Sequence, residues 1–166
     1  ERFLEGNRID NAQSWTDIPD HDRVFPAVVR TEAPYAQIDF VGGFTGASGS
    51  CFYDGGAWPS EWNSSHFVCE PTVNLVHHDV LAPKGVTFEA TKARDGEFIT
   101  SRDLWFRPVD VRVGPDGALY VLDFYSQAVV HNDTRGPQHG PTNFAIRPDR
   151  DHEHGRIWRV QHKRAK

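Results

Sequence analysis

A hairpin pattern, PVDVRV–GPDG–ALYVLDFY, occupies residues 108–125 and predicts β structure there. Apolar side chains recur at Val109, Val111 and Val113 with the two-residue period of a half-buried strand. Between the two runs, residues 114–117 supply a proline that presets φ, an aspartate (Asp116) and a glycine that accepts positive φ. The segment therefore predicts two antiparallel strands joined by a tight turn.

A similar arrangement lies upstream, in residues 50–101, as the runs SCFYDG, HFVCEP, NLVHHDVLA, VTFEATKA and EFITS. QAVVHN and GRIWRV are further strand candidates, and no window carries a helical stripe. The two units recur at an offset of about 55–60 residues, a little longer than the roughly 40–50 of propeller blades. A recurring four-stranded antiparallel unit is the signature of a β-propeller. We therefore expect an all-β fold, a partial propeller of about two to three blades, with a β-sandwich as the structural alternative.

Composition agrees with turn-rich β structure and excludes several classes of function. Fourteen glycines and eleven prolines disfavour long helices, whereas 38% hydrophobic residues permit a packed core. The net charge of -5 gives no electrostatic case for nucleic-acid binding. No apolar run approaches the ~18 residues of a membrane helix, and the opening ERFLEGNRID contains no apolar signal-peptide core.

Two blades cannot close a ring, because they leave open faces and strand edges that invite aggregation. We therefore expect the chain to be a segment of a longer propeller that the remaining blades complete, and to be unstable alone. We expect residues 1–48 to be an irregular crossing segment and partial blade, with a short strand at 25–30. Residues 49–104 form one blade, 105–162 the final blade and 163–166 a basic tail.

The two cysteines, Cys51 and Cys69, restrict metal and redox chemistry. No CxxC or CxxCH motif occurs, so a zinc ribbon, a redox pair and a covalent haem have no support in this segment. A single Cys51–Cys69 disulfide, which would imply an oxidising compartment, and two unrelated buried thiols both remain open.

Five motifs in a fixed order carry a resemblance to a known family: FVCEPxxNLVH, WFRPVD, GPDGALYVxDFY, HNDTRG and HGRIWRV. Over about residues 17–163 the chain resembles the bacterial family of membrane-bound dehydrogenase propellers, which is similar to soluble quinoprotein glucose and sorbosone dehydrogenases. The resemblance implies the last part of a six-bladed propeller and a periplasmic or secreted location. It also implies that a c-type haem domain is a candidate partner.

The resemblance implies oxidation of a sugar or alcohol with pyrroloquinoline quinone (PQQ) and calcium, with electrons passed to a haem or another acceptor. Two other functions fit the same fold, because a fold alone does not set the chemistry. One is a non-catalytic propeller that acts as a binding or scaffold module. The other is a calcium-dependent, lactonase-like hydrolase in which the ion is a Lewis acid.

Candidate site residues follow from blade geometry and from the resemblance. An inner strand starts where the next strand ends, so Arg107 is expected near Asp123 and Tyr125, and Cys51 near Glu70. Arg107 falls where the sugar quinoproteins contact the quinone, and its forked donors suit a carboxylate. The asparagine of that motif is absent because Pro108 follows directly. Carboxylates such as Glu70 and Asp123 suit calcium.

Each candidate also has a structural interpretation. Arg107 and Asp123 form a structural ion pair in the simplest alternative. His77 and His78 are neighbours on a strand and face opposite sides, which disfavours a metal pair. A histidine base for alcohol oxidation is therefore expected on another blade.

Two further groups of side chains each have two interpretations. The polar run RPDRDHEHG holds either a calcium ion or a solvated loop. Four tryptophans either stack on sugar or fill gaps between blades. The polar side chains of that run and the tryptophans are Asp149, Asp151, His152, Glu153 and His154, and Trp58, Trp62, Trp105 and Trp158.

Overall fold

The computed structural model describes residues 24, 25, 27, 44, 46–103, 105–126 and 153–166. Within these residues the fold is all-β, as the sequence predicted, with one short 3-10 helix, η1 (Ser60–Trp62). No helix in this part of the chain has the length and apolarity that a membrane crossing requires. The strands are β1 (Ser50–Phe52), β2 (Ser65–Glu70), β3 (Leu75–Lys84), β4 (Thr87–Lys92), β5 (Ile99–Thr100), β6 (Pro108–Val113), β7 (Leu119–Asp123) and β8 (Arg156–Val160).

The first sheet is an antiparallel blade with the order β1-β2-β3-β4, in which β5 also pairs with β3. β4 pairs with Asp79–Lys84 of β3, and β5 pairs with Leu75–Val76 of the same strand. β4 and β5 therefore follow one another along the edge of β3 that faces away from β2. The sheet thus has five strands, of which β4 and β5 share one edge of β3 and are separated by residues 93–98.

The second sheet has the order β6-β7-β8 and forms the neighbouring blade. Val111 pairs with Val121, which pairs with Trp158, and the register shifts between Pro108 and Asp110. The predicted turn is present, because Gly117 N donates to Gly114 O at 2.9 Å and Gly117 has a φ of 71°. The prediction of antiparallel propeller-like blades is thus confirmed for both sheets.

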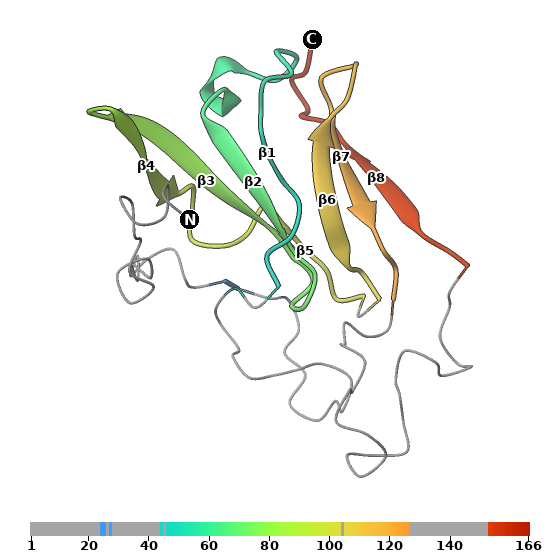
Figure 1. The fold of residues 1–166 in the computed structure, drawn as a ribbon. Helices are drawn as coiled ribbons and strands as arrows, with labels where there is room; N and C mark the ends of the chain where they lie inside the picture. The colour runs from blue at the N-terminus through green and yellow to red at the C-terminus, as the bar shows by residue number, and fades with distance from the viewer. Residues whose placement is uncertain (1–23, 26, 28–43, 45, 104, 127–152) are drawn as a thin grey trace, which may run out of the picture.

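The blades share one core, in which β6 lies against both β1 and β2 (Figure 1). Gly49, just before β1, donates its N–H to Val109 O at 2.8 Å and accepts a bond from Cys69 N at 2.9 Å. A Cβ at position 49 would lie 2.4 Å from Asp110 Cα, so only glycine permits this approach. The shared core consists of Tyr53, Trp58, Phe67, Cys69, Val76, Val111, Leu119 and Val121.

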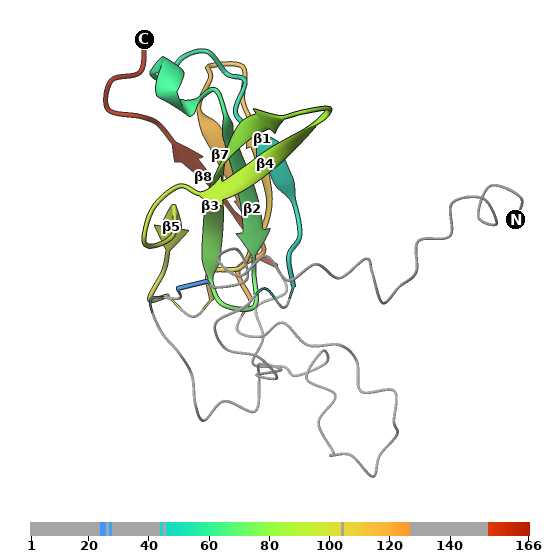
Figure 2. The same ribbon diagram turned by 90° about the vertical axis from the view of Figure 1, so that its left-hand side faces the viewer.

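The loops gather at two opposite ends of the blades (Figures 1 and 2). One end, called the rim below, carries the β2–β3 loop, the β5–β6 connection and the end of β7. The other end carries η1, the β6–β7 turn and the C-terminus. The strand expected at residues 25–30 and the QAVVHN strand lie largely or wholly outside the described residues, and Phe25, which is described, is in no strand.

Candidate functional site

The charged residues that the sequence placed at the rim do come together there, and they are buried. Glu70, Asp123 and Arg107 are 0%, 3% and 4% exposed. Arg107 N donates to Asp123 Oδ1 at 2.7 Å, and Phe124 N donates to Arg107 O at 2.8 Å. The expected proximity of Arg107 and Asp123 follows from the pairing of Pro108 with Asp123 in the sheet.

The guanidinium group of Arg107 binds backbone carbonyls from three loop positions. Nη1 donates to Pro71 O at 2.8 Å and to Thr72 O at 3.0 Å, and Nε donates to Ser126 O at 3.0 Å. Buried carbonyl groups need such partners, so Arg107 links the β2–β3 loop of one blade to the segment that follows β7 in the other.

The carboxylate of Asp123 is a hub that accepts four hydrogen bonds. Oδ1 accepts from the backbone N–H of Arg107 at 2.7 Å and of Tyr125 at 2.9 Å. Oδ2 accepts from Arg156 Nε at 2.8 Å and from Trp158 Nε1 at 3.0 Å. The side chain that forms the ion pair with Asp123 is therefore Arg156 of β8, a partner that the sequence pattern did not indicate.

Next to this hub, aromatic rings and a cation lie together at the rim. The Arg156 guanidinium carbon is 3.8 Å from the ring centroid of Tyr125, a cation–π geometry, and Trp105 stands 5.3 Å from the same ring. Arg156 also binds Asp103 at 3.0 Å. Burial lowers the pKa of Arg156, but the bonds to Asp103 and Asp123 outweigh this and raise it.

Tyr125 holds an uncommon backbone conformation, with a φ of 49°. Positive φ is an outlier for a bulky residue, and such strained positions concentrate at functional sites. The bond from Tyr125 N to Asp123 Oδ1 helps to hold it there. We call Trp105, Tyr125 and Arg156 the rim cluster.

Glu70 holds backbone amides. Its Oε2 accepts from Gly46 N at 2.8 Å and its Oε1 accepts from Thr72 N at 3.0 Å. A carboxylate bound in this way orders its loop and is poorly placed to give up those amides for calcium.

Three of the candidate residues for quinone and calcium, Arg107, Asp123 and Glu70, direct their polar atoms to neighbouring backbone and side chains. Both groups need donors or oxygens that face a cavity, whereas Arg107 and Asp123 are buried and bound to neighbouring backbone and side chains. Among the described residues, no three His, Cys, Asp or Glu side chains are placed to hold a metal ion. Glu153 and His154 of the polar run are exposed, and Asp149, Asp151 and His152 lie outside the described residues.

Asp79, His77 and Glu97 form a buried group that the sequence did not reveal. The group lies on the face of the first sheet opposite the one that carries Phe67 and the shared core. His77 Nδ1 lies 2.6 Å from Glu97 Oε2, and Nε2 lies 2.9 Å from Asp79 Oδ1. A neutral imidazole has one N–H, so two carboxylate partners require the doubly protonated ring. Burial lowers the pKa of His77, but the bonds to Asp79 and Glu97 outweigh it and raise the pKa to about 9.

Glu97 also binds groups beyond His77. It accepts from Phe25 N at 2.9 Å and pairs with Lys92 at 3.2 Å. Glu97 lies in the interruption between β4 and β5, so the group fixes this irregular edge and residue 25 to β3.

His78 points to the opposite face, as the strand alternation predicts. Its ring stacks on Phe67 with centroids 4.7 Å apart, and Nε2 lies 2.8 Å from Ser65 Oγ. Burial and the charge of Arg94 lower the pKa of His78 to about 4, so the ring is neutral at pH 7. Neither His77 nor His78 lies at the rim, where a base for substrate oxidation would be needed.

The candidate disulfide is not formed, because Cys51 and Cys69 are free thiols. Cys51 pairs with Phe67, so Cys69 is its diagonal rather than its direct neighbour. Diagonal Cβ atoms are roughly 7 Å apart, whereas a disulfide needs about 4 Å. Burial raises the pKa of Cys51 to about 11 and that of Cys69 to about 12.

The four candidate tryptophans lie in different places, and Trp62 belongs to η1 at the end opposite the rim. Trp58 is 4% exposed in the core and stacks on Tyr53 at 4.6 Å. Trp105 and Trp158 lie at the rim end, where Trp158 is 44% exposed.

Comparison with known families places the whole of this region in one domain. A family described as "Domain of unknown function (DUF7133)" matches residues 2–164. The chain has no significant match among curated proteins or solved structures.

Proposed function

This chain belongs to the DUF7133 family, and we propose that its rim forms part of the sugar- or alcohol-binding wall of a propeller dehydrogenase. The rim cluster carries this proposal. It combines two aromatic rings with a guanidinium, and it lies at the end of the blades where several loops meet. The resemblance to quinoprotein sugar dehydrogenases supplies the reaction class.

The chemistry of the rim cluster suits a polyol ligand. Aromatic rings offer broad apolar faces to the C–H groups of a sugar, and a few fixed polar groups then set its orientation. Arg156 and Asp103 are partly exposed, at 30% and 41% of their side chains, and can bond to hydroxyl groups. The buried hub at Asp123 fixes Tyr125, which follows β7, and Arg156, the first residue of β8.

In this proposal the described residues bind and orient the ligand, and the redox group is held by another part of the propeller. Arg107 and Asp123 act as positioning residues, since their polar atoms bind the loops and strand ends around the rim. The base that takes a hydroxyl proton also belongs elsewhere, because His77 and His78 lie away from the rim.

A non-catalytic binding module is the second candidate. It is favoured by one observation, the saturation of Asp123 by four internal hydrogen bonds. A binding module that had lost catalysis would still need buried charges that stabilise the rim, and Asp123 is such a charge. The calcium-dependent hydrolase has no comparable support in the described residues.

The test separates binding from oxidation in the full-length protein. Binding of a panel of aldoses and polyols is measured by calorimetry, and dye reduction is measured with the same panel after addition of PQQ and calcium. Trp105→Ala and Tyr125→Ala should each weaken sugar binding at least tenfold, whereas Phe88→Ala, an exposed aromatic on β4, should not.

Three outcomes are informative. Sugar binding together with dye reduction supports the dehydrogenase, and binding without dye reduction supports the binding module. If no sugar binds, or if Phe88→Ala weakens binding as much as Trp105→Ala, the proposal for the rim is wrong.

A further inference from the structure

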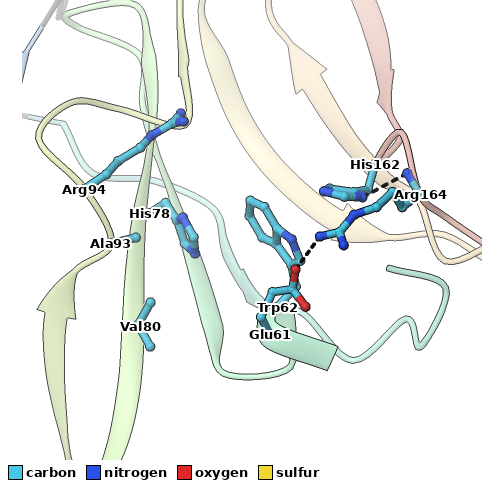
Figure 3. A pocket seen from close by; sticks show the side chains of 8 residues that line it. All are labelled: Glu61, Trp62, His78, Val80, Ala93, Arg94, His162 and Arg164. Carbon is cyan, nitrogen blue, oxygen red and sulfur yellow. Dashed lines mark hydrogen bonds and ion pairs between the residues drawn. The ribbon is translucent and has the colours of Figure 1, made fainter. Parts of the chain in front are cut away.

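A pocket of about 420 Å³ lies at the end of the blades opposite the rim (Figure 3). It lies between β3 of the first blade, η1 and the segment that follows β8. Small-molecule sites have volumes of roughly 300–1,000 Å³, so this pocket has room for a metabolite-sized ligand. None of its lining residues belongs to the rim cluster.

A row of three rings runs through the pocket lining, from His78 through Trp62 to His162. His78 and Trp62 stack with centroids 5.1 Å apart and an interplanar angle of 11°. Trp62 and His162 are tilted by 58° with centroids 5.7 Å apart. The faces and edges of these rings offer a polarisable surface to a ring-shaped or planar ligand.

Two cations stand at opposite ends of this row, Arg94 on the β4–β5 side and Arg164 on the C-terminal side (Figure 3). Nη2 of Arg94 donates to the carbonyls of Glu97 and Phe98, and its Nε and Nη1 make no hydrogen bond within the part of the chain that the structure describes. Arg164 Nη2 binds Glu61 Oε1 at 2.6 Å, and both side chains are more than half exposed. An exposed pair of this kind is weak and can exchange partners.

Hydrogen-bond donors outnumber acceptors in the lining. His162 Nδ1 accepts from Arg164 N at 3.1 Å, which places the ring proton on Nε2. Neither His162 Nε2 nor Trp62 Nε1 has a hydrogen-bond partner in the described part of the chain. With two guanidinium groups and one carboxylate, the ionised lining carries a net positive charge.

We propose that this pocket binds a small organic anion. A planar or ring-shaped body lies against the His78–Trp62–His162 row, its carboxylate meets Arg164, and Arg94 adds positive charge at the other end of the row. Electrostatic attraction alone would suit any anion, whereas the ring row adds a preference for an organic body. The ligand carboxylate competes with Glu61 for Arg164, and this competition lowers the affinity of the pocket for the ligand.

The experiment uses benzoate as the probe and benzamide as its neutral isostere, with the full chain as the protein. Binding is followed by NMR through the ring resonances of His78 and His162. Benzoate should bind saturably and at least tenfold more tightly than benzamide. The same tightness for both compounds, or no saturable shift with benzoate, would overturn the proposal.

Removing a positive charge and removing a negative charge from the pocket should change the benzoate affinity in opposite directions, so these variants are controls for each other. Arg94→Gln and Arg164→Gln should each weaken benzoate binding at least fivefold, and Glu61→Gln should strengthen it. Arg112→Gln removes one exposed positive charge from β6, away from the pocket, and should leave the affinity unchanged. If all three arginine variants weaken benzoate binding equally, the loss reflects the net charge of the protein, and the proposal of a benzoate site in this pocket is wrong.

Two features keep this test decisive. If Arg94→Gln fails to fold, Glu61→Gln still tests the sign of the effect, because Glu61 is an exposed side chain. The Trp105→Ala variant of the rim should retain benzoate binding, so failure of the rim proposal and failure of this one can be told apart.

Discussion

Asp123 and Arg156 form an ion pair with an N–O distance of 2.8 Å, in which the carboxylate is fully buried and the guanidinium lies beneath the ring of Tyr125. The same carboxylate accepts a hydrogen bond from Arg107 N, next to the start of β6. It also accepts one from Tyr125 N, and the backbone of Tyr125 is left-handed, with a φ of 49°. One side chain thus connects β6, β7 and β8 to the exposed rim cluster. Changes at Asp123 should therefore alter both stability and the geometry of the rim.

Asp123→Asn should destabilise the protein by about 2–3 kcal/mol, because an amide cannot accept all four bonds and leaves buried donors unsatisfied. The denaturant midpoint measures this loss. Asp116→Asn is the control, since Asp116 is an exposed turn residue that caps Ala118 N and should change the midpoint little. Equal effects of the two substitutions would contradict the role of Asp123 as a hub.

Arg107→Lys should also destabilise the protein, by about 1–2 kcal/mol, because an ammonium group cannot reproduce the fork that binds Pro71 O, Thr72 O and Ser126 O. Arg112→Lys on the exposed face of β6 is the matched control and should be neutral. If Arg107→Lys keeps full stability but abolishes quinone binding in the full-length protein, Arg107 contacts the cofactor after all.

The strands were predictable because their signals are local. Alternating valines and a Gly-Pro-Asp-Gly turn specify β6 and β7, and the pairing that follows brings Arg107 to Asp123. The directions of the side chains were not predictable in the same way. The Arg107 fork binds carbonyls 35 and 36 residues away in the chain, and no pattern in one sequence indicates such a partner.

The buried group around His77 shows the same limit. His77 and Asp79 share a face of β3 through the two-residue period, which the sequence does imply. Glu97 joins them because β4 and β5 are separated by residues 93–98. The separate runs VTFEATKA and EFITS indicate this break, but they do not indicate that the side chain of Glu97 reaches His77. The positive φ of Tyr125 was likewise hidden, since tyrosine is uncommon there.

Gly49→Ala should separate the blades. The new Cβ would lie 2.1 Å from Asp110 Oδ1 and 2.4 Å from Asp110 Cα, and the backbone atom cannot rotate away. We expect a loss of about 2–3 kcal/mol, as for other overpacked sites, measured by the denaturant midpoint. Gly155→Ala is the control, because its Cβ would meet Asp123 O at an ordinary 3.5 Å.

Cys51 and Cys69 should react slowly with alkylating reagents in the folded protein. Their raised pKa values, about 11 and about 12, leave little thiolate at pH 8, and the thiolate is the reactive form. Intact mass spectrometry after alkylation should give no modification in native buffer and two adducts in denaturant without reductant. A mass that needs prior reduction to accept two adducts would reveal a disulfide.

The stability of the protein should fall as the pH rises from about 6.5 to about 9. The folded pKa of His77, about 9, lies above its ordinary value of 6.5, so the folded state binds the proton more tightly than the unfolded state. The proton on His77 contributes on the order of 3 kcal/mol to the free energy of unfolding. This contribution is fully present below pH 6.5 and is lost as the pH rises through the folded pKa. Urea midpoints from pH 6 to 10 measure it. His77→Gln should flatten this dependence, whereas His66→Gln, a change on the neighbouring strand β2, should keep it. A dependence that survives in His77→Gln would mean that another group titrates.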